Sequence, residues 1–196
     1  MKRTQFAGMV MMALVAVAAR GEVGGMKPEL GVGLVVSPGY RDTLEQAYPD
    51  SEVSGGYGWL EMYFGMRYEA APQFEVIPKI GLLVNFVSSV GGDDAFANTI
   101  VQPAVGGRYL FSEGDTFFVE GELSYNAVNT GSDAFDVDGG IGYAALVGYR
   151  WEAGFSVALG YSMLSTDVTY KDWRGANDAT GDENFGGIEF RFSGSF

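Results

Sequence analysis

The chain of 196 residues is long enough for one domain with a full hydrophobic core, and 47% hydrophobic residues argue against disorder. Its formal net charge of -13 disfavours nucleic acid as a partner. The chain contains no cysteine and no histidine, which excludes disulfides, thiolate or imidazole metal sites, and chemistry that needs a histidine base.

The N-terminal residues form a separate unit. Lys2 and Arg3 precede an uncharged run over 6–19 that ends in small residues, which is the layout of a secretory signal peptide. A transmembrane anchor is the alternative, but the run is shorter than the roughly 20 residues that a spanning helix needs. We therefore predict a cleaved signal peptide over 1–19 and a short lead-in over 20–28.

From Glu29 onward, apolar residues recur at every second position, as in strands with one apolar face. In the first stretch Leu30, Val32 and Leu34 alternate with glutamate and glycine. Thirty glycines against six prolines are typical of a sheet protein with tight turns. The pattern predicts eight strands of transmembrane length, near 29–37, 57–68, 74–86, 99–111, 116–126, 139–151, 154–163 and 186–196.

The connections between the predicted strands alternate in length. The segments AAPQ, SEGD and EAG are short enough for hairpin turns. The long polar segments are 38–56, 87–98, 127–138 and 164–185. Short turns at one end and long loops at the other predict an up-and-down antiparallel meander without a second domain.

An arginine followed by an aromatic residue recurs late on every second strand. The pairs Arg67-Tyr68, Arg108-Tyr109, Arg150-Trp151 and Arg191-Phe192 are spaced by 41, 42 and 41 residues, which indicates a hairpin repeat. Each arginine has the polar parity and each aromatic residue the apolar parity. The aromatic residues predicted to form a ring at one membrane interface are Tyr68, Phe74, Tyr109, Phe117, Trp151, Phe155 and Phe192.

The last segment, IEFRFSGSF, keeps one apolar face up to its final phenylalanine. With the eight strands and the signal peptide, it resembles the small eight-stranded outer-membrane β-barrels of Gram-negative bacteria, the group of the outer membrane protein A barrel, outer membrane protein X and the opacity-type adhesins. The resemblance covers 29–196. It implies an all-β transmembrane barrel in the cell outer membrane and an assembly signal for the barrel-assembly machinery at Phe190, Phe192 and Phe196.

The resemblance also sets the expected surroundings. Outer-membrane lipid and lipopolysaccharide would surround a monomer, and we expect no peptidoglycan-binding domain after Phe196. A secreted soluble barrel of the lipocalin type is the competing architecture, because periodicity alone does not say which face is outside. Small residues such as Gly140, Gly142 and Ala144 on the polar parity of one strand favour a crowded lumen instead.

An eight-stranded barrel leaves room inside for side chains and little else. On the polar parity, six acidic and five basic residues nearly balance, so we expect them to pair in the lumen. The network either plugs the lumen or lines a narrow ion path in which the pairs exchange partners. Its predicted members are Glu29, Glu61, Arg67, Glu75, Lys79, Arg108, Glu120, Glu122, Arg150, Glu189 and Arg191.

Most of the remaining charge is acidic and lies in the predicted long loops. Such a surface repels lipopolysaccharide unless divalent cations bridge the two. Solvated loops are one interpretation, and calcium binding, with spacing unlike an EF-hand, is the other. The candidate calcium ligands are Asp133, Asp136, Asp138, Asp178, Asp182 and Glu183. The loop aromatics either bind an extracellular ligand or cap the barrel rim, and they are Tyr40, Tyr48, Phe96, Phe135, Tyr170 and Trp173.

Catalysis is not expected. The chain lacks the G-x-S-x-G and G-x-x-x-x-G-K motifs, and Glu120 with Glu122 would need an open cleft to act as a glycosidase pair. We expect no cofactor. The sequence favours a barrel with a plugged lumen that serves envelope structure or surface interaction, including adhesion. The alternative is a small porin-like channel for ions or an apolar solute.

Overall fold

The computed structural model describes residues 25–55, 58–85, 88–90, 99–129, 135–171 and 179–196. The predicted signal peptide over 1–19 lies outside the described residues. The first strand begins at Lys27, two residues before the predicted boundary at Glu29.

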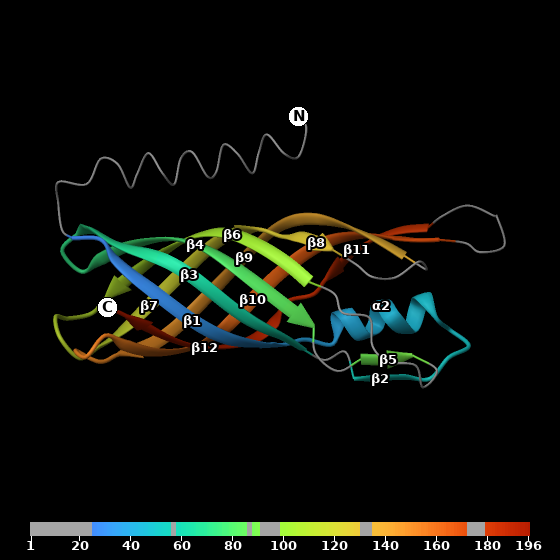
Figure 1. The fold of residues 1–196 in the computed structure, drawn as a ribbon, viewed down its shortest axis with the longest axis horizontal. Coiled ribbons are helices and arrows are strands. Elements are labelled where there is room, and N and C mark those ends of the chain that lie inside the picture. Colours follow the sequence, from blue (N-terminus) through green and yellow to red (C-terminus); the bar gives the residue numbers. More distant parts are fainter. Residues whose placement is uncertain (1–24, 56–57, 86–87, 91–98, 130–134, 172–178) are drawn as a thin grey trace, which may run out of the picture.

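Eight long strands form one closed antiparallel barrel (Figure 1), which confirms the predicted fold class. Each strand pairs with its neighbour in the sequence, and the last pairs with the first, from Glu29 opposite Ser195 to Val36 opposite Ile188. The barrel strands are β1 (Lys27–Val36), β3 (Gly58–Ala71), β4 (Phe74–Asn85), β6 (Thr99–Leu110), β7 (Thr116–Tyr125), β9 (Phe135–Arg150), β10 (Phe155–Tyr170) and β12 (Gly187–Ser195).

The two faces of the strands differ in the way that the sequence predicted. The apolar parity points outward, where Leu30 is 50% and Phe190 is 51% exposed. The polar parity points inward and is buried, as at Glu61 and Arg108. A lipocalin-type arrangement has the opposite faces, so the structure excludes it. The outer surface of the barrel is apolar, as contact with lipid requires.

The long connections contain more regular structure than the sequence predicted. The predicted loop over 38–56 holds a helix, α2 (Gly39–Ala47), and β2 (Val53–Gly55), which pairs with β5 (Ser88–Val90). The predicted loops over 127–138 and 164–185 hold the extended ends of β9 and β10, with β8 (Ala127–Asn129) beside β6 and β11 (Ala179–Asn184) beside β10. Those loop predictions were therefore wrong for these residues.

The extended end of β10 was missed because its polarity is reversed. In the first half of the strand, nearer Phe155, Leu159 and Tyr161 point outward and are exposed. In the second half of the strand, nearer Tyr170, Asp167 is exposed on that face, while Leu164 and Val168 are buried on the other. The alternation continues along the strand, but the apolar side chains change from the outer face to the inner face. This exchange marks the height at which the barrel leaves an apolar environment for water.

An apolar core closes the barrel at the end where the long loops lie, which we call the loop end; the opposite end is the short-turn end (Figure 1). Tyr40 and Leu44, one turn apart on α2, are buried against this core. The ring of Tyr40 lies 5.3 Å from that of Trp59 and 5.5 Å from that of Phe185. Burial raises the pKa of the Tyr40 hydroxyl above its ordinary value. No helix in the described ranges is long and apolar enough to cross a membrane.

Gly148 of β9 tests how tightly the inside of the barrel is packed. A Cβ at this position would overlap the ring of Phe118 and the carbonyl oxygen of Val157. The ring has little room to move because the guanidinium of Arg108 lies 4.6 Å from its centroid. We expect Gly148→Ala to lower the free energy of unfolding by about 1–3 kcal/mol, measured from the denaturant midpoint in detergent. Gly121→Ala is the matched control, because a Cβ there meets no atom within 4 Å. Equal midpoints for the two variants would contradict this packing.

Candidate functional site: the ion-paired lumen

The inward faces of the barrel strands bring together all eleven charged residues that the sequence predicted for the lumen. Ten of them are buried and Arg150 is half-buried. They come from every barrel strand except β10. Ion pairs link all eleven, so the charges form one continuous network: Glu29, Glu61, Arg67, Glu75, Lys79, Arg108, Glu120, Glu122, Arg150, Glu189 and Arg191.

Arg108 of β6 lies at the centre of the network and is 1% exposed. Its Nη1 and Nη2 atoms donate to the two carboxylate oxygens of Glu29, each at 3.1 Å, and its Nε atom donates to Glu120 at 2.8 Å. The hydroxyl of Tyr63 donates to Glu29 at 2.9 Å. Bidentate pairs of this kind fix both direction and distance. Arg108 therefore ties β1 to β7 across the lumen.

Arg191 of β12 organises the part of the network nearer the loop end. Its Nη1 atom donates to Glu120 and to Glu122, both at 3.1 Å, and its Nη2 atom lies 3.4 Å from Glu61. Lys79 also pairs with Glu122 and lies 3.9 Å from Glu120. Glu120 contacts both Arg108 and Arg191, so it joins the two halves.

Beyond the charges, the lumen becomes less polar toward the loop end. The side-chain amide of Gln102 donates to Asn126 at 2.9 Å and to Ser124 at 3.2 Å. Between this layer and the charges lies a small cavity of about 10 Å³, lined by Glu61, Ser162 and other residues, which is room for about one water molecule. The apolar core around Trp59, which is 0% exposed, follows. Charged, neutral polar and apolar layers therefore fill the lumen in turn.

Sequence reasoning missed the apolar layer. Its signal was present, because Trp59, Leu83 and Leu164 are large apolar residues on the otherwise polar parity of their strands. Such residues inside a barrel predict an apolar layer rather than an aqueous channel. The helix that seals this layer also left a signal, since Tyr40 and Leu44 are spaced by one helical turn.

The predicted interface aromatics lie on the outer face near the short-turn end. Phe117 packs edge-on against Tyr149 with 5.0 Å between the ring centroids, and Phe155 stacks on Phe192 with 6.0 Å between them. Six of the seven predicted residues are exposed and Tyr68 is half-buried. Phe190, Phe192 and Phe196 are exposed on the same face, and their role in assembly stays a prediction.

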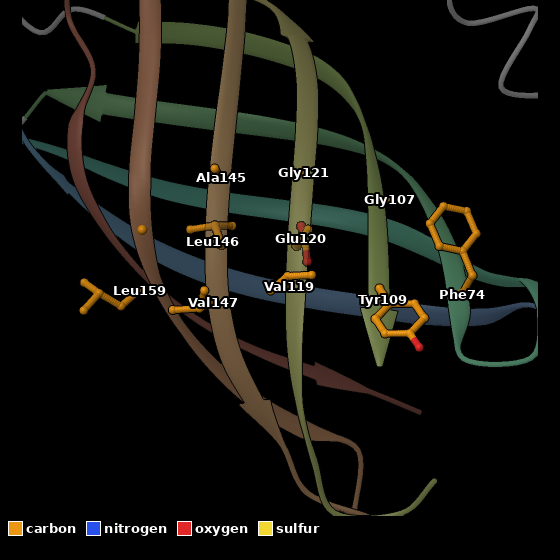
Figure 2. Close-up of a pocket in the computed structure, with 11 residues that line it drawn as sticks. Phe74, Gly107, Tyr109, Val119, Glu120, Gly121, Ala145, Leu146, Val147 and Leu159 are labelled. Atoms are coloured by element: carbon orange, nitrogen blue, oxygen red, sulfur yellow. The ribbon is translucent and has the colours of Figure 1, made fainter. Parts of the chain in front are cut away.

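A groove of about 500 Å³ crosses this outer face over β4, β6, β7, β9 and β10 (Figure 2). Gly107 lies opposite Gly121, and Gly121 opposite Ala145, so small side chains form its floor. Phe74 and Tyr109 flank one end, and Val147 and Leu159 lie toward the other. Its lining is apolar apart from Glu120, whose carboxylate binds arginines inside the lumen.

The candidate calcium ligands do not form a metal site in the described part of the chain. Asp133 and Asp178 lie outside the described residues. Asp136, Asp138, Asp182 and Glu183 are described, and no group of three or more acidic residues there could hold a metal ion. Asp136 instead pairs with Lys171 at 3.1 Å. Calcium binding stays a prediction that this geometry does not support.

Four of the six predicted loop aromatics pack at the barrel rim rather than standing free. Tyr40 and Phe135 belong to the apolar core, and Tyr48 and Tyr170 pack against it. Phe96 and Trp173 lie outside the described residues. For the four that are described, the capping interpretation holds.

Arg108 provides the test of the network. We expect Arg108→Ala to lower the free energy of unfolding by about 3–5 kcal/mol, because Glu29 and Glu120 would remain buried with fewer partners. The measurement is the denaturant midpoint of the refolded protein in detergent. Lys171→Ala is the control, because Lys171 forms an exposed pair with Asp136 at 3.1 Å, and such pairs contribute less than about 1 kcal/mol. An unchanged midpoint for Arg108→Ala would rule out a stabilising network.

No protein-family model and no curated protein sequence matches this chain. Among solved structures, it is similar to the outer membrane protein OprG from Pseudomonas aeruginosa, with a TM-score of 0.61 and 13% sequence identity. The match covers 90% of this chain and 98% of that one. At this identity the likeness shows the fold alone. The chain therefore has the fold of the eight-stranded outer-membrane β-barrels to which OprG belongs.

Proposed function

We propose that the protein is an integral outer-membrane barrel with a closed lumen, and that it serves envelope structure or contacts at the cell surface. The observation that carries this proposal is that two successive layers of side chains fill the inside of the barrel. The ion network around Arg108 and Arg191 fills one level, and the apolar core beneath α2 fills the next.

The membrane location is supported by the outer surface of the barrel. Its strands present apolar side chains outward, with aromatic residues near the short-turn end, as transmembrane barrels do at a membrane interface. The predicted signal peptide and the fold shared with OprG agree with this location. In the usual orientation of such barrels, the short turns face the periplasm and the long loops face outside.

Closure of the lumen is supported by the energetics of the buried charges. An ion that crossed the network would separate Arg108 from Glu29 and Glu120, and breaking one buried pair typically costs about 3–5 kcal/mol. It would then meet the apolar core, where no charge could be compensated. Two unlike barriers in series favour a plug over an ion path.

A surface role is supported by the acidic outer face at the loop end. Asp138, Asp167 and Asp182 lie directly opposite one another on β9, β10 and β11, and all three are exposed. A row of like charges attracts cationic partners. Adhesion through this face is the form of surface contact that we propose.

Single-channel recording of the refolded mature protein in a planar bilayer tests the closed lumen. We expect no conductance steps although the protein is inserted, with insertion checked by protease protection of the barrel. Steady steps that change when Glu120→Gln removes one lumen charge would contradict the proposal and favour an ion channel.

Passage of an apolar solute is a second candidate, favoured by a gap in the sheet. On the side of β6 that faces β7 and β8, the ladder skips Gln102 and Pro103, between Val101 opposite Ala127 and Ala104 opposite Ser124, whereas both residues pair with β4 on the other side. Proline lacks the N–H group that the ladder needs. If this gap is an exit toward lipid, the protein should speed transfer of an apolar dye into liposomes, and Pro103→Val should slow it. Equal transfer rates for the wild type and protein-free liposomes would exclude this candidate.

A further inference from the structure

A polar pocket of about 260 Å³ opens at the short-turn end of the barrel, beside the members of the ion network that lie nearest that end. It is distinct from the apolar groove on the outer face. Strands β1, β3 and β9 each supply one basic residue to its wall. Its charged lining residues are Lys27, Arg67 and Arg150, with Glu75 inside and Glu69 and Glu152 exposed at the rim.

The buried part of this pocket has more positive than negative groups. The Nε atom of Arg67 lies 3.5 Å from Oε1 of Glu75, and Nη1 of Arg150 lies 2.7 Å from the same oxygen. The other oxygen of Glu75 lies 3.8 Å from Arg108. One carboxylate therefore faces three guanidinium groups. Arg108 has Glu29 and Glu120 as further partners, whereas in the described part of the chain Arg67 and Arg150 form ion pairs with Glu75 alone.

Two further features favour the binding of an anion in this pocket. Lys27 lies directly opposite Arg67 on the neighbouring strand, and like charges in that position repel each other. The side chain of Arg67 is 9% exposed, and its Nη1 atom has no hydrogen-bond partner within the described part of the chain. Buried donors normally have an acceptor. An anion between Arg67, Lys27 and Arg150 would supply that acceptor and reduce the repulsion.

We propose that this pocket binds an anionic phosphate group, either the headgroup of an anionic phospholipid in the adjoining leaflet or free phosphate. A tetrahedral phosphate presents oxygens in several directions at once, which suits cations arriving from three strands. Guanidinium groups match phosphate oxygens as paired donors, and the ammonium of Lys27 adds a mobile point charge. Trp151 lies in the same pocket wall, so the pocket opens at the height of the predicted interface aromatics.

Two measurements on the refolded mature protein in nonionic detergent distinguish the sources of phosphate. Titration calorimetry with inorganic phosphate, against chloride at equal ionic strength, detects the free anion. Native mass spectrometry after addition of phosphatidylglycerol or phosphatidylcholine detects a retained anionic lipid. Only the lipid measurement rests on the proposed membrane location. If that location is wrong, the phosphate titration still tests anion binding by the pocket.

Lys27→Gln is the main variant, because Lys27 is exposed and its loss leaves the core of the network intact. Arg150→Gln is the second variant. We expect each to weaken binding about tenfold, the usual effect of removing one charged hydrogen bond. Lys171→Gln at the loop end is the control and should leave affinity unchanged. Binding of neither phosphate nor phosphatidylglycerol by the wild type, or an equal loss in the control, would overturn the proposal.

Discussion

Closure of the sheet is the constraint on which the rest of the structure depends. Once β12 pairs with β1, the ladder has no free edge, so the barrel strands expose no row of unpaired peptide groups to lipid. Eight strands also leave a lumen only as wide as the side chains that fill it. Every inward charge must therefore find its partner inside. The bidentate contact between Arg108 and Glu29 is a direct result of that confinement.

The barrel changes character along its length, on both faces at once. Near the short-turn end it is apolar outside and charged inside, whereas near the loop end it is acidic outside and apolar inside. β10 carries no lumen charge but shows the change on one continuous strand, because Leu159 is exposed on its outer face, whereas further along Asp167 is exposed on that face and Val168 is buried on the inner one. A barrel built this way needs a cover for the apolar inner surface above the membrane, and α2 supplies it through Tyr40 and Leu44.

Much of this architecture could be predicted from the sequence because alternation has a period of two and a barrel has only two faces. The inward position of Glu61 and Arg67 follows from their parity on one strand. The helix over Gly39–Ala47 could not be predicted from this alternation, because its packing depends not only on Trp59 of the next barrel strand but also on Phe185, near the other end of the sequence. Partner choice within the network, such as Glu120 with both Arg108 and Arg191, depends on strand tilt and stagger, which alternation does not specify.

The sequence separation of the lumen pairs has a consequence for the order of folding. Glu29 and Arg108 are separated by 79 positions, and Arg191 and Glu120 by 71. Each contact joins strands that are three places apart in the sheet, β1 with β6 and β7 with β12, so neither can form until the sheet has curled far enough to bring those strands across the lumen from each other. A partly built barrel would hold these charges without their partners, at the full cost of keeping them from water. The network therefore stabilises the finished barrel selectively and makes the last step of strand joining cooperative.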